Sequence, residues 1–301
     1  MNLYTSHQNK LIGSIDQAVT NLAQIHPLDN SYYAQCLEIF EANSNQRLGL
    51  LGWLEANVIA KMSQDVNAIL SVGCGTGAFD ERILRYARSR MKQVTYLGIE
   101  PNEISAAEFS HTMDKQASDR VDVAVLVQKF GEQVFENQFD LILFVHSIYY
   151  LEDRNDAIDA ALKALKPGGE LIVVIAPDEE LNTVANLMWQ RQMEQQSWFS
   201  EDVRAHFDAA DLEYGETRVS ANLNANGCFG ESTEVGRNIV DFIVQTRADQ
   251  LPTGLRNDIS DFLMSITQGQ GATTCLPHPV DIFRCKKPEK FKGELHQKNI
   301  F

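Results

Sequence analysis

The sequence predicts an α/β protein in which a parallel sheet is wrapped by helices on both faces. Three observations lead to this prediction. Short apolar runs alternate with helical patterns through the middle of the 301-residue chain. One apolar run ends in a glycine-rich loop, residues 73–77, which leads into a helical pattern. Another run ends in an acidic residue, Glu100. Alternation of this kind is typical of parallel sheets with crossover helices.

Residues 1–62 are predicted to be helical and to form a cap before the sheet. Apolar residues between Ile12 and Ile25 recur every three or four positions, which gives one apolar helix face. The segment 27–31 contains proline and polar residues and interrupts this pattern. A second helical stretch is expected over about 32–62.

The sheet is expected to follow from residue 63. Its predicted parallel strands lie near 68–73, 94–99, 121–127, 139–145 and 170–176. Ligands of open parallel sheets bind at the carboxyl ends of the strands, where the strand order reverses. The glycine loop, Glu100 and residues 145–147 all lie at such ends, so a single site is expected there.

The glycine loop and Glu100 have the properties of a nucleotide-like cofactor site. Gly73, Gly75 and Gly77 fall at alternate positions, and a small loop lets the backbone approach a ligand closely. Glu100 lies 23 residues after Gly77, close to the spacing of an acid that accepts hydrogen bonds from a ribose diol. A carboxylate at this position would repel a 2′-phosphate.

Two further segments identify a resemblance to a known family. A strand begins with the sequence F-D-L-I at Phe139, and a turn with the sequence L-K-P-G-G begins at Leu165. With the glycine loop and Glu100, these segments resemble the class I S-adenosylmethionine-dependent methyltransferases over about residues 65–178. The resemblance implies a Rossmann-like, seven-stranded and mostly parallel sheet. It also implies S-adenosylmethionine as cofactor and S-adenosylhomocysteine as product.

The resemblance implies a set of cofactor-binding residues at the ends of the strands. The glycines shape the loop, Glu100 binds the ribose, and the remaining positions flank the adenine or the methionine part. The implied residues are Gly73, Gly75, Gly77, Glu100, Ser105, Lys129, Phe130, Val145 and His146.

The tyrosine pair after the fourth strand resembles the same corner of histamine N-methyltransferase. By this likeness, the residues that line the substrate pocket are Tyr149, Tyr150, Trp189, Cys228 and Phe229. Glu38 and His278 are further candidates, because they lie near the positions at which that enzyme holds its substrate. Other positions depart from that enzyme. Its substrate-binding glutamate is replaced by Ile39, and its asparagine falls in the segment 277–279. A glutamine that helps to hold its cofactor corresponds to Ser105. The substrate is therefore expected to differ from histamine.

The carboxyl-terminal part, residues 179–301, is expected to complete the fold. The family's last two strands form an antiparallel pair, and here a helical insert, residues 224–278, separates them. The predicted elements are helices near 179–197, 200–210, 234–247 and 252–267, strands at 211–223 and 280–285, a link at 268–272 and a polar tail at 286–301.

Composition restricts the class of function. The net charge is −15, which disfavours nucleic-acid binding because phosphates must be neutralised by Lys and Arg. No apolar run is long enough to cross a membrane and no signal peptide is recognised, so a cytoplasmic protein is expected. The five cysteines are an odd number without a C-x-x-C pair, which predicts neither a disulfide framework nor a metal site.

These observations predict an S-adenosylmethionine-dependent N-methyltransferase for a small amine or imidazole-type metabolite. His146 is the candidate for proton handling, with Tyr150 beside the acceptor. The chain is expected to act as a monomer or weak homo-oligomer. Two alternatives stay open: an O- or C-methyltransferase of small-molecule biosynthesis, and a non-catalytic cofactor-binding partner protein.

Overall fold

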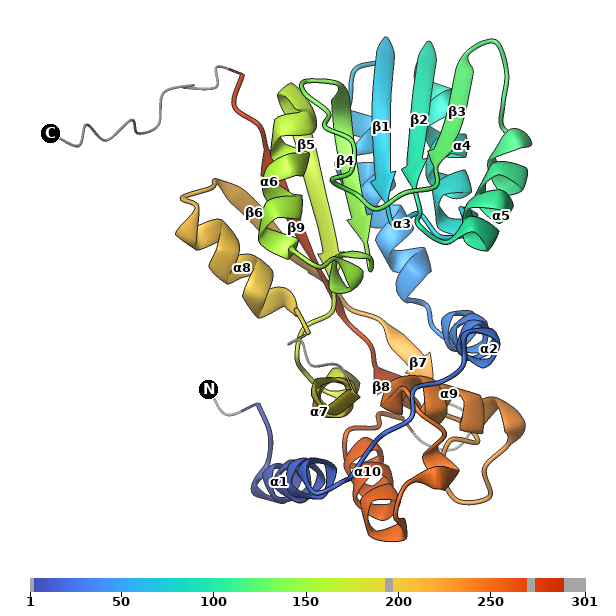
Figure 1. Ribbon diagram of the computed structural model, residues 1–301, viewed down its shortest axis with the longest axis vertical. Helices are drawn as coiled ribbons and strands as arrows, with labels where there is room; N and C mark the ends of the chain where they lie inside the picture. Colours follow the sequence, from blue (N-terminus) through green and yellow to red (C-terminus); the bar gives the residue numbers. More distant parts are fainter. Residues whose placement is uncertain (1–2, 193–196, 270–273, 290–301) are drawn as a thin grey trace, which may run out of the picture. The chain divides into compact units, whose positions relative to one another are not determined.

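The computed structural model describes residues 3–192, 197–269 and 274–289 (Figure 1). The chain divides into two compact units, each assembled from three segments. Residues 51–175, 203–217 and 282–301 make up the sheet unit. Residues 1–50, 176–202 and 218–281 make up the helical unit.

The sheet has seven strands in the order β3-β2-β1-β4-β5-β9-β6, which confirms the predicted Rossmann-like fold. Parallel ladders join β3 to β2, β2 to β1, β1 to β4 and β4 to β5. The strand order reverses at β1, which lies between β2 and β4. The strands are β1 (Val66–Val72), β2 (Gln93–Ile99), β3 (Val121–Leu126), β4 (Phe139–Val145), β5 (Leu165–Ile175), β6 (Tyr214–Val219) and β9 (Val280–Lys286).

One face of β1, β2 and β3 is covered by two helices. Helix α4 (Ala78–Arg90) packs on β2, and helix α5 (Glu103–Asp114) packs on β3. Gly98 of β2 permits this packing, because a Cβ there would lie 2.8 Å from the Phe109 ring of α5. Helix α6 (Arg154–Ala164) packs on β5.

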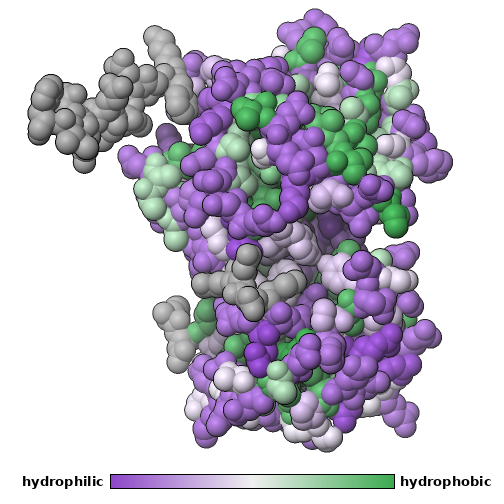
Figure 2. Space-filling view, in the orientation of Figure 1, coloured by the Kyte–Doolittle hydropathy of each residue, from purple (hydrophilic) through white to green (hydrophobic). Residues whose placement is uncertain are grey.

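The opposite face of β1 to β3 is less covered than predicted. The connection 127–138 between β3 and β4 contains no helix, so the predicted alternation of strand and helix fails there. Thr95, Leu97 and Ala124 instead line a shallow hollow of about 380 Å³. Hydrophobic colour lies over β2 and β3 on this face in Figure 2. The short, polar and glycine-containing connection explains the missing helix.

The helical unit has its own apolar core. Helix α1 packs on α7 and α10, and α9 packs on α2 and α7. Buried apolar residues of these helices and of a two-stranded sheet, β7–β8, form one cluster. The elements are α1 (Ser6–Thr20), α2 (Asn30–Ala42), α7 (Leu181–Gln192), α9 (Glu234–Val244), α10 (Thr253–Ser265), β7 (Asn222–Asn224) and β8 (Cys275–Pro277).

Two predicted elements have the wrong boundaries. The helical stretch 32–62 is divided into α2, α3 (Gln46–Asn57) and a short 3-10 turn, Ile59–Lys61. The predicted strand 211–223 is broken, because β6 ends at Val219 and β7 belongs to the small sheet. Helix α8 (Ser200–Ala209) precedes that strand. The ends of the predicted helix 179–197, of the link 268–272 and of the tail 286–301 lie outside the described residues.

Candidate functional site

The glycine loop after β1 has a backbone that side chains would obstruct. Gly73, Gly75 and Gly77 have left-handed φ values of +65°, +55° and +77°. A Cβ on Gly73 would lie 2.5 Å from the Cβ of Ser147, and one on Gly77 would lie 2.8 Å from Phe109. A Cβ on Gly75 would meet nothing within 4 Å, so space is open beside this residue. A ligand can therefore approach the backbone at Gly75.

Glu100, at the end of β2, is joined directly to this loop. Its Oε2 accepts a hydrogen bond from the Gly75 N–H at 3.0 Å, and its Oε1 accepts one from the Asn102 N–H at 2.9 Å. A carboxylate has about four acceptor directions, so each oxygen can accept a further hydrogen bond. The structure thus brings together a half-buried anion and an open stretch of backbone.

Three further predicted cofactor residues follow β2 and β3 in the chain: Ser105, near Glu100, and the predicted adenine contacts Lys129 and Phe130. Ser105 is half-buried in the first turn of α5, and its N–H donates to the cap residue Asn102. Lys129 is exposed and forms a 2.6 Å ion pair with Glu152, which raises the pKa of the lysine and lowers that of the glutamate. Phe130 packs edge-on against Phe144 of β4, with ring centroids 5.6 Å apart.

The end of β4 carries a strained histidine beside two tyrosines. His146 has a left-handed φ of +53°, which is uncommon for a residue with a side chain. Its N–H donates to the carbonyl of Val174, and its Nδ1 lies 3.2 Å from the Tyr149 hydroxyl. The Tyr149 ring is stacked against His146 and stands edge-on to Tyr150, which is 61% exposed. This unusual backbone conformation lies directly after β4, and such conformations are common at ligand sites. Val145, the last residue of β4, is half-buried beside them.

Sequence reasoning missed a polar contact beneath the glycine loop. Tyr96 of β2 is fully buried and donates a 2.7 Å hydrogen bond to Asp80, in the first turn of α4. Burial raises the pKa of Tyr96, and the Asp80 carboxylate raises it further. The contact ties the helix that follows the loop to the strand that carries Glu100. A tyrosine in an apolar strand gives no signal of this from sequence, because it resembles ordinary core.

Ile104 and Val127 near the strand ends were not singled out from the sequence, and Ser147 was included only within the segment 145–147. Ile104, in the first turn of α5, and Val127, directly after β3, are 73% and 53% exposed although both are apolar. Ser147 is buried against Gly73, and its hydroxyl has no hydrogen-bond partner among the described residues. Its position directly after His146 was the available sequence signal.

The remaining predicted substrate residues lie in the helical unit. Glu38 is exposed on α2, and Trp189 is half-buried on α7. Cys228 belongs to the apolar core, where burial raises the pKa of its thiol to about 12, and Phe229 packs against the same core. The Cys228 thiol is therefore neutral and packed as a small apolar group.

His278 is the most constrained of these residues. Its Nδ1 lies 2.8 Å from the Ser44 hydroxyl, and its ring stands edge-on to Phe40 at 4.9 Å. Burial, together with the nearby Arg47, lowers the pKa of His278 to about 4. The imidazole is therefore neutral at physiological pH and serves as a hydrogen-bonding group.

Comparisons with known proteins agree with this geometry. Residues 70–171 match the model of a methyltransferase domain. Over 115 residues the chain is 27% identical to malonyl-[acyl-carrier protein] O-methyltransferase 2 of Ilyobacter polytropus, covering 36% of this chain and 39% of that protein. It is 17% identical to histamine N-methyltransferase of Danio rerio over 257 residues, covering 78% of this chain and 88% of that enzyme.

Solved structures share the fold. The YcgJ protein of Bacillus subtilis matches with a TM-score of 0.53 at 16% identity, covering 80% of this chain and 98% of that one. A candidate methyltransferase of Bacillus halodurans matches with a TM-score of 0.55 at 12% identity, covering 79% and 98%. The chain therefore contains a methyltransferase domain, within the fold of the class I S-adenosylmethionine-dependent methyltransferases.

The methyltransferase uses S-adenosylmethionine as its cofactor. The residues at the strand ends fit this group, because the open backbone at Gly75 lies beside a carboxylate that can accept hydroxyl hydrogen bonds. Within the described ranges, no three acidic, histidine or cysteine side chains are grouped so as to hold a metal ion. No helix in the described part of the chain is long and apolar enough to cross a membrane.

Proposed function

We propose that this methyltransferase transfers the methyl group to a nitrogen of a small amine or imidazole-type metabolite. The observation that carries the proposal is the extent of the likeness to histamine N-methyltransferase, which covers 78% of this chain. That extent exceeds the methyltransferase domain at 70–171 and includes part of the helical unit. The likeness to the O-methyltransferase covers only 36% of the chain.

In this proposal the cofactor binds at the carboxyl ends of the strands. Glu100 accepts hydrogen bonds from the ribose hydroxyls, and the loop from Gly73 to Gly77 lies against the methionine part. The open space beside Gly75 and its hydrogen bond to Glu100 support this assignment. The other cofactor contacts we propose are Ser105, Lys129, Phe130, Val145 and His146.

Bound S-adenosylmethionine supplies a methyl group on a positively charged sulfur. An amine can attack it only with a free lone pair, so a base must accept the amine proton. We assign this role to the imidazole of His146, whose Nδ1 faces the Tyr149 hydroxyl at 3.2 Å. The rings of Tyr149 and Tyr150 offer aromatic faces to a cationic acceptor.

We also propose substrate-binding roles for Glu38, Trp189, Cys228, Phe229 and His278. The acceptor is a small molecule and not a nucleic acid, because a net charge of −15 opposes phosphate binding. The charge also favours the approach of cationic substrates. We further propose a cytoplasmic enzyme that acts as a monomer or weak homo-oligomer.

A panel of acceptors tests the nature of the nucleophile. Amines, imidazoles, phenols and carboxylates of similar size are incubated with the enzyme and S-adenosylmethionine, and S-adenosylhomocysteine release and product masses are measured. We expect turnover with nitrogen acceptors. Methylation confined to oxygen or carbon acceptors would overturn the proposal and favour the alternative raised by the O-methyltransferase likeness.

A His146→Asn variant tests the proposed base. Asparagine adopts a positive φ more readily than most residues, so the backbone at the end of β4 is retained. We expect kcat with an active amine to fall by about 10²–10⁴, the usual contribution of a general base. An unchanged kcat would exclude His146 as the base.

A further inference from the structure

A second hollow lies within the helical unit. Its volume is about 190 Å³. Its walls come from the start of the chain, from the turn before α7 and from the segment around β8. The lining residues are Leu3, Tyr4, Gln8, Glu179, Glu180, Ile266, Gln268 and Pro277. Three of the lining residues are apolar, and the others carry carboxylates, amides and a phenol.

Glu180 is the unusual member of this lining. Its carboxylate has no hydrogen-bond or ion-pair partner among the described residues, and its Oε2 is buried. Its own N–H donates a 2.6 Å hydrogen bond to the Tyr4 hydroxyl, which fixes the backbone beside the hollow. A buried carboxylate oxygen normally has a donor or a cation beside it, since burial of an unpaired anion is costly.

The charges around Glu180 do not balance. Arg218 pairs with Glu179 at 2.8 Å and with the fully buried Asp281 at 2.8 Å. Its single positive charge is therefore already shared between two carboxylates before Glu180 is counted. Burial raises the pKa of Glu180, and the charge of Glu179 raises it further. Among the described residues, Glu180 thus has no cation paired with it.

We propose that this hollow binds a small organic ammonium ion. The ammonium group would pair with the Glu180 carboxylate and donate to the side-chain carbonyl of Gln268. An alkyl stem would lie on Leu3, Ile266 and Pro277. A volume of about 190 Å³ holds on the order of six non-hydrogen atoms, at about 30 Å³ for each water-sized group.

This inference does not depend on the proposed function. Binding of an ammonium ion to the hollow is measured without S-adenosylmethionine and without turnover. If butylammonium does not bind, the proposed nitrogen methylation is unaffected. If the acceptor panel shows no nitrogen methylation, the proposed ammonium site is unaffected. The two ideas therefore fail separately.

Butylammonium is a suitable probe because it has one ammonium group and a four-carbon stem. Its affinity for the full chain is measured by calorimetry, beside neutral 1-butanol as a shape control. We expect butylammonium to bind and butanol not to bind. In Glu180→Gln the affinity should fall by about tenfold or more, as for loss of a charged hydrogen bond. Equal binding of butanol, or no butylammonium binding by the wild type, would overturn the proposal.

A matched variant distinguishes binding at this site from general electrostatic attraction to an acidic protein. Glu231→Gln removes one exposed carboxylate from the same unit and should bind butylammonium as the wild type does. An equal loss of butylammonium affinity in both variants would show a non-specific charge effect. An unchanged affinity in Glu180→Gln would show that Glu180 does not bind the ammonium group. If Glu180→Gln does not fold, Glu180→Asp keeps the charge on a shorter side chain and should bind more weakly than the wild type. Wild-type affinity in Glu180→Asp would then contradict the proposed direct pairing.

Discussion

At the scale of single residues, unusual backbone conformations gather at the ends of β1 and β4. The glycines of the loop and His146 all have positive φ values. The glycines were found from the sequence because their alternate spacing is a local pattern. The strain at His146 gives no sequence signal, because a histidine after an apolar strand is compatible with many conformations.

His278 predicts a pH dependence of stability. Its pKa falls from 6.5 to about 4 on folding, because the imidazole is buried and Arg47 lies nearby. Between these pH values the unfolded chain binds a proton that the folded chain excludes. The free energy of unfolding should therefore decrease on acidification from pH 6.5 to about 4, by up to about 3 kcal/mol from this group.

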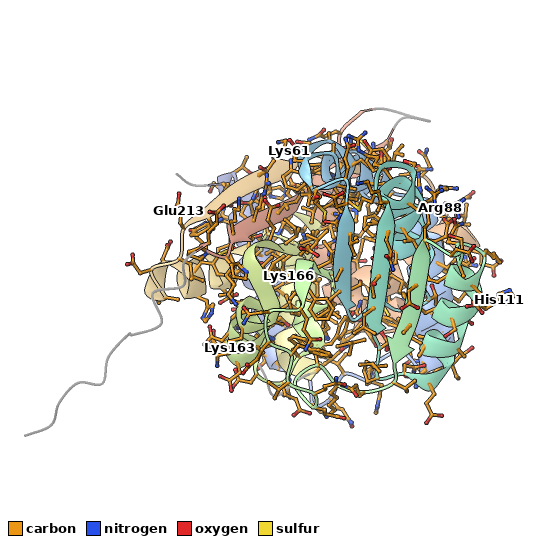
Figure 3. All side chains as sticks on the ribbon, turned by 90° about the horizontal axis from the view of Figure 1, so that it is seen from above. Lys61, Arg88, His111, Lys163, Lys166 and Glu213 are labelled. Atoms are coloured by element: carbon orange, nitrogen blue, oxygen red, sulfur yellow. The ribbon has the colours of Figure 1, made fainter. Side chains whose placement is uncertain are left out.

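Urea unfolding at several pH values measures this contribution as a difference between proteins. In His278→Gln the stability should change less between pH 7 and pH 4.5 than in the wild type. His111→Gln, at an exposed position on α5 (Figure 3), should keep the wild-type dependence. Parallel curves for the wild type and His278→Gln would contradict a depressed pKa.

At the scale of elements, the sequence predicted the core strands well and the peripheral connections less well. The apolar runs that end at Gly73 and at Glu100 became β1 and β2, because buried parallel strands are continuous apolar segments. The strand predicted over 211–223 was wrong. Its residues divide between two sheets, and long-range pairing of that kind has no local pattern.

Lys287 shows how one side chain fastens the last strand to the rest of the sheet unit. It is 5% exposed, and its Nζ donates to the carbonyl oxygens of Lys163 and Leu165 and to Oδ1 of Asn137. These acceptors lie at the end of α6, at the start of β5 and before β4. Lys163 is labelled in Figure 3. A lysine in a polar tail gave no sign of this role in the sequence.

The Lys287→Met variant is predicted to lose about 1–3 kcal/mol of unfolding free energy. The substitution keeps an unbranched side chain but leaves the buried Leu165 carbonyl without the lysine donor, whereas the Lys163 carbonyl still accepts from the Asn137 N–H. Its exposed neighbour provides the control, because Lys286→Met should lie within about 0.5 kcal/mol of the wild type. Equal stabilities for the two variants, measured by urea unfolding, would show that the buried ammonium does not hold β9.

At the scale of the whole molecule, the organisation of the chain differs from its linear order. Each compact unit is assembled from three separate segments, so the amino-terminal helices share a core with helices from the carboxyl-terminal third. The sequence predicted the helices but not their partners, because helix periodicity identifies an apolar face and not what covers it. The cofactor residues were predictable because they lie at the ends of neighbouring parallel strands.

Binding of S-adenosylhomocysteine to the wild type and to Glu100→Gln should be measured first, by titration calorimetry. Glutamine can still accept the Gly75 hydrogen bond, so the loop should be retained while the charged acceptors for the ribose are lost. We expect the wild type to bind and Glu100→Gln to bind about 30- to 100-fold more weakly. The control variant Glu103→Gln, at the first residue of α5, should bind as well as the wild type. Wild-type affinity in a folded Glu100→Gln variant would contradict a cofactor site at these strand ends.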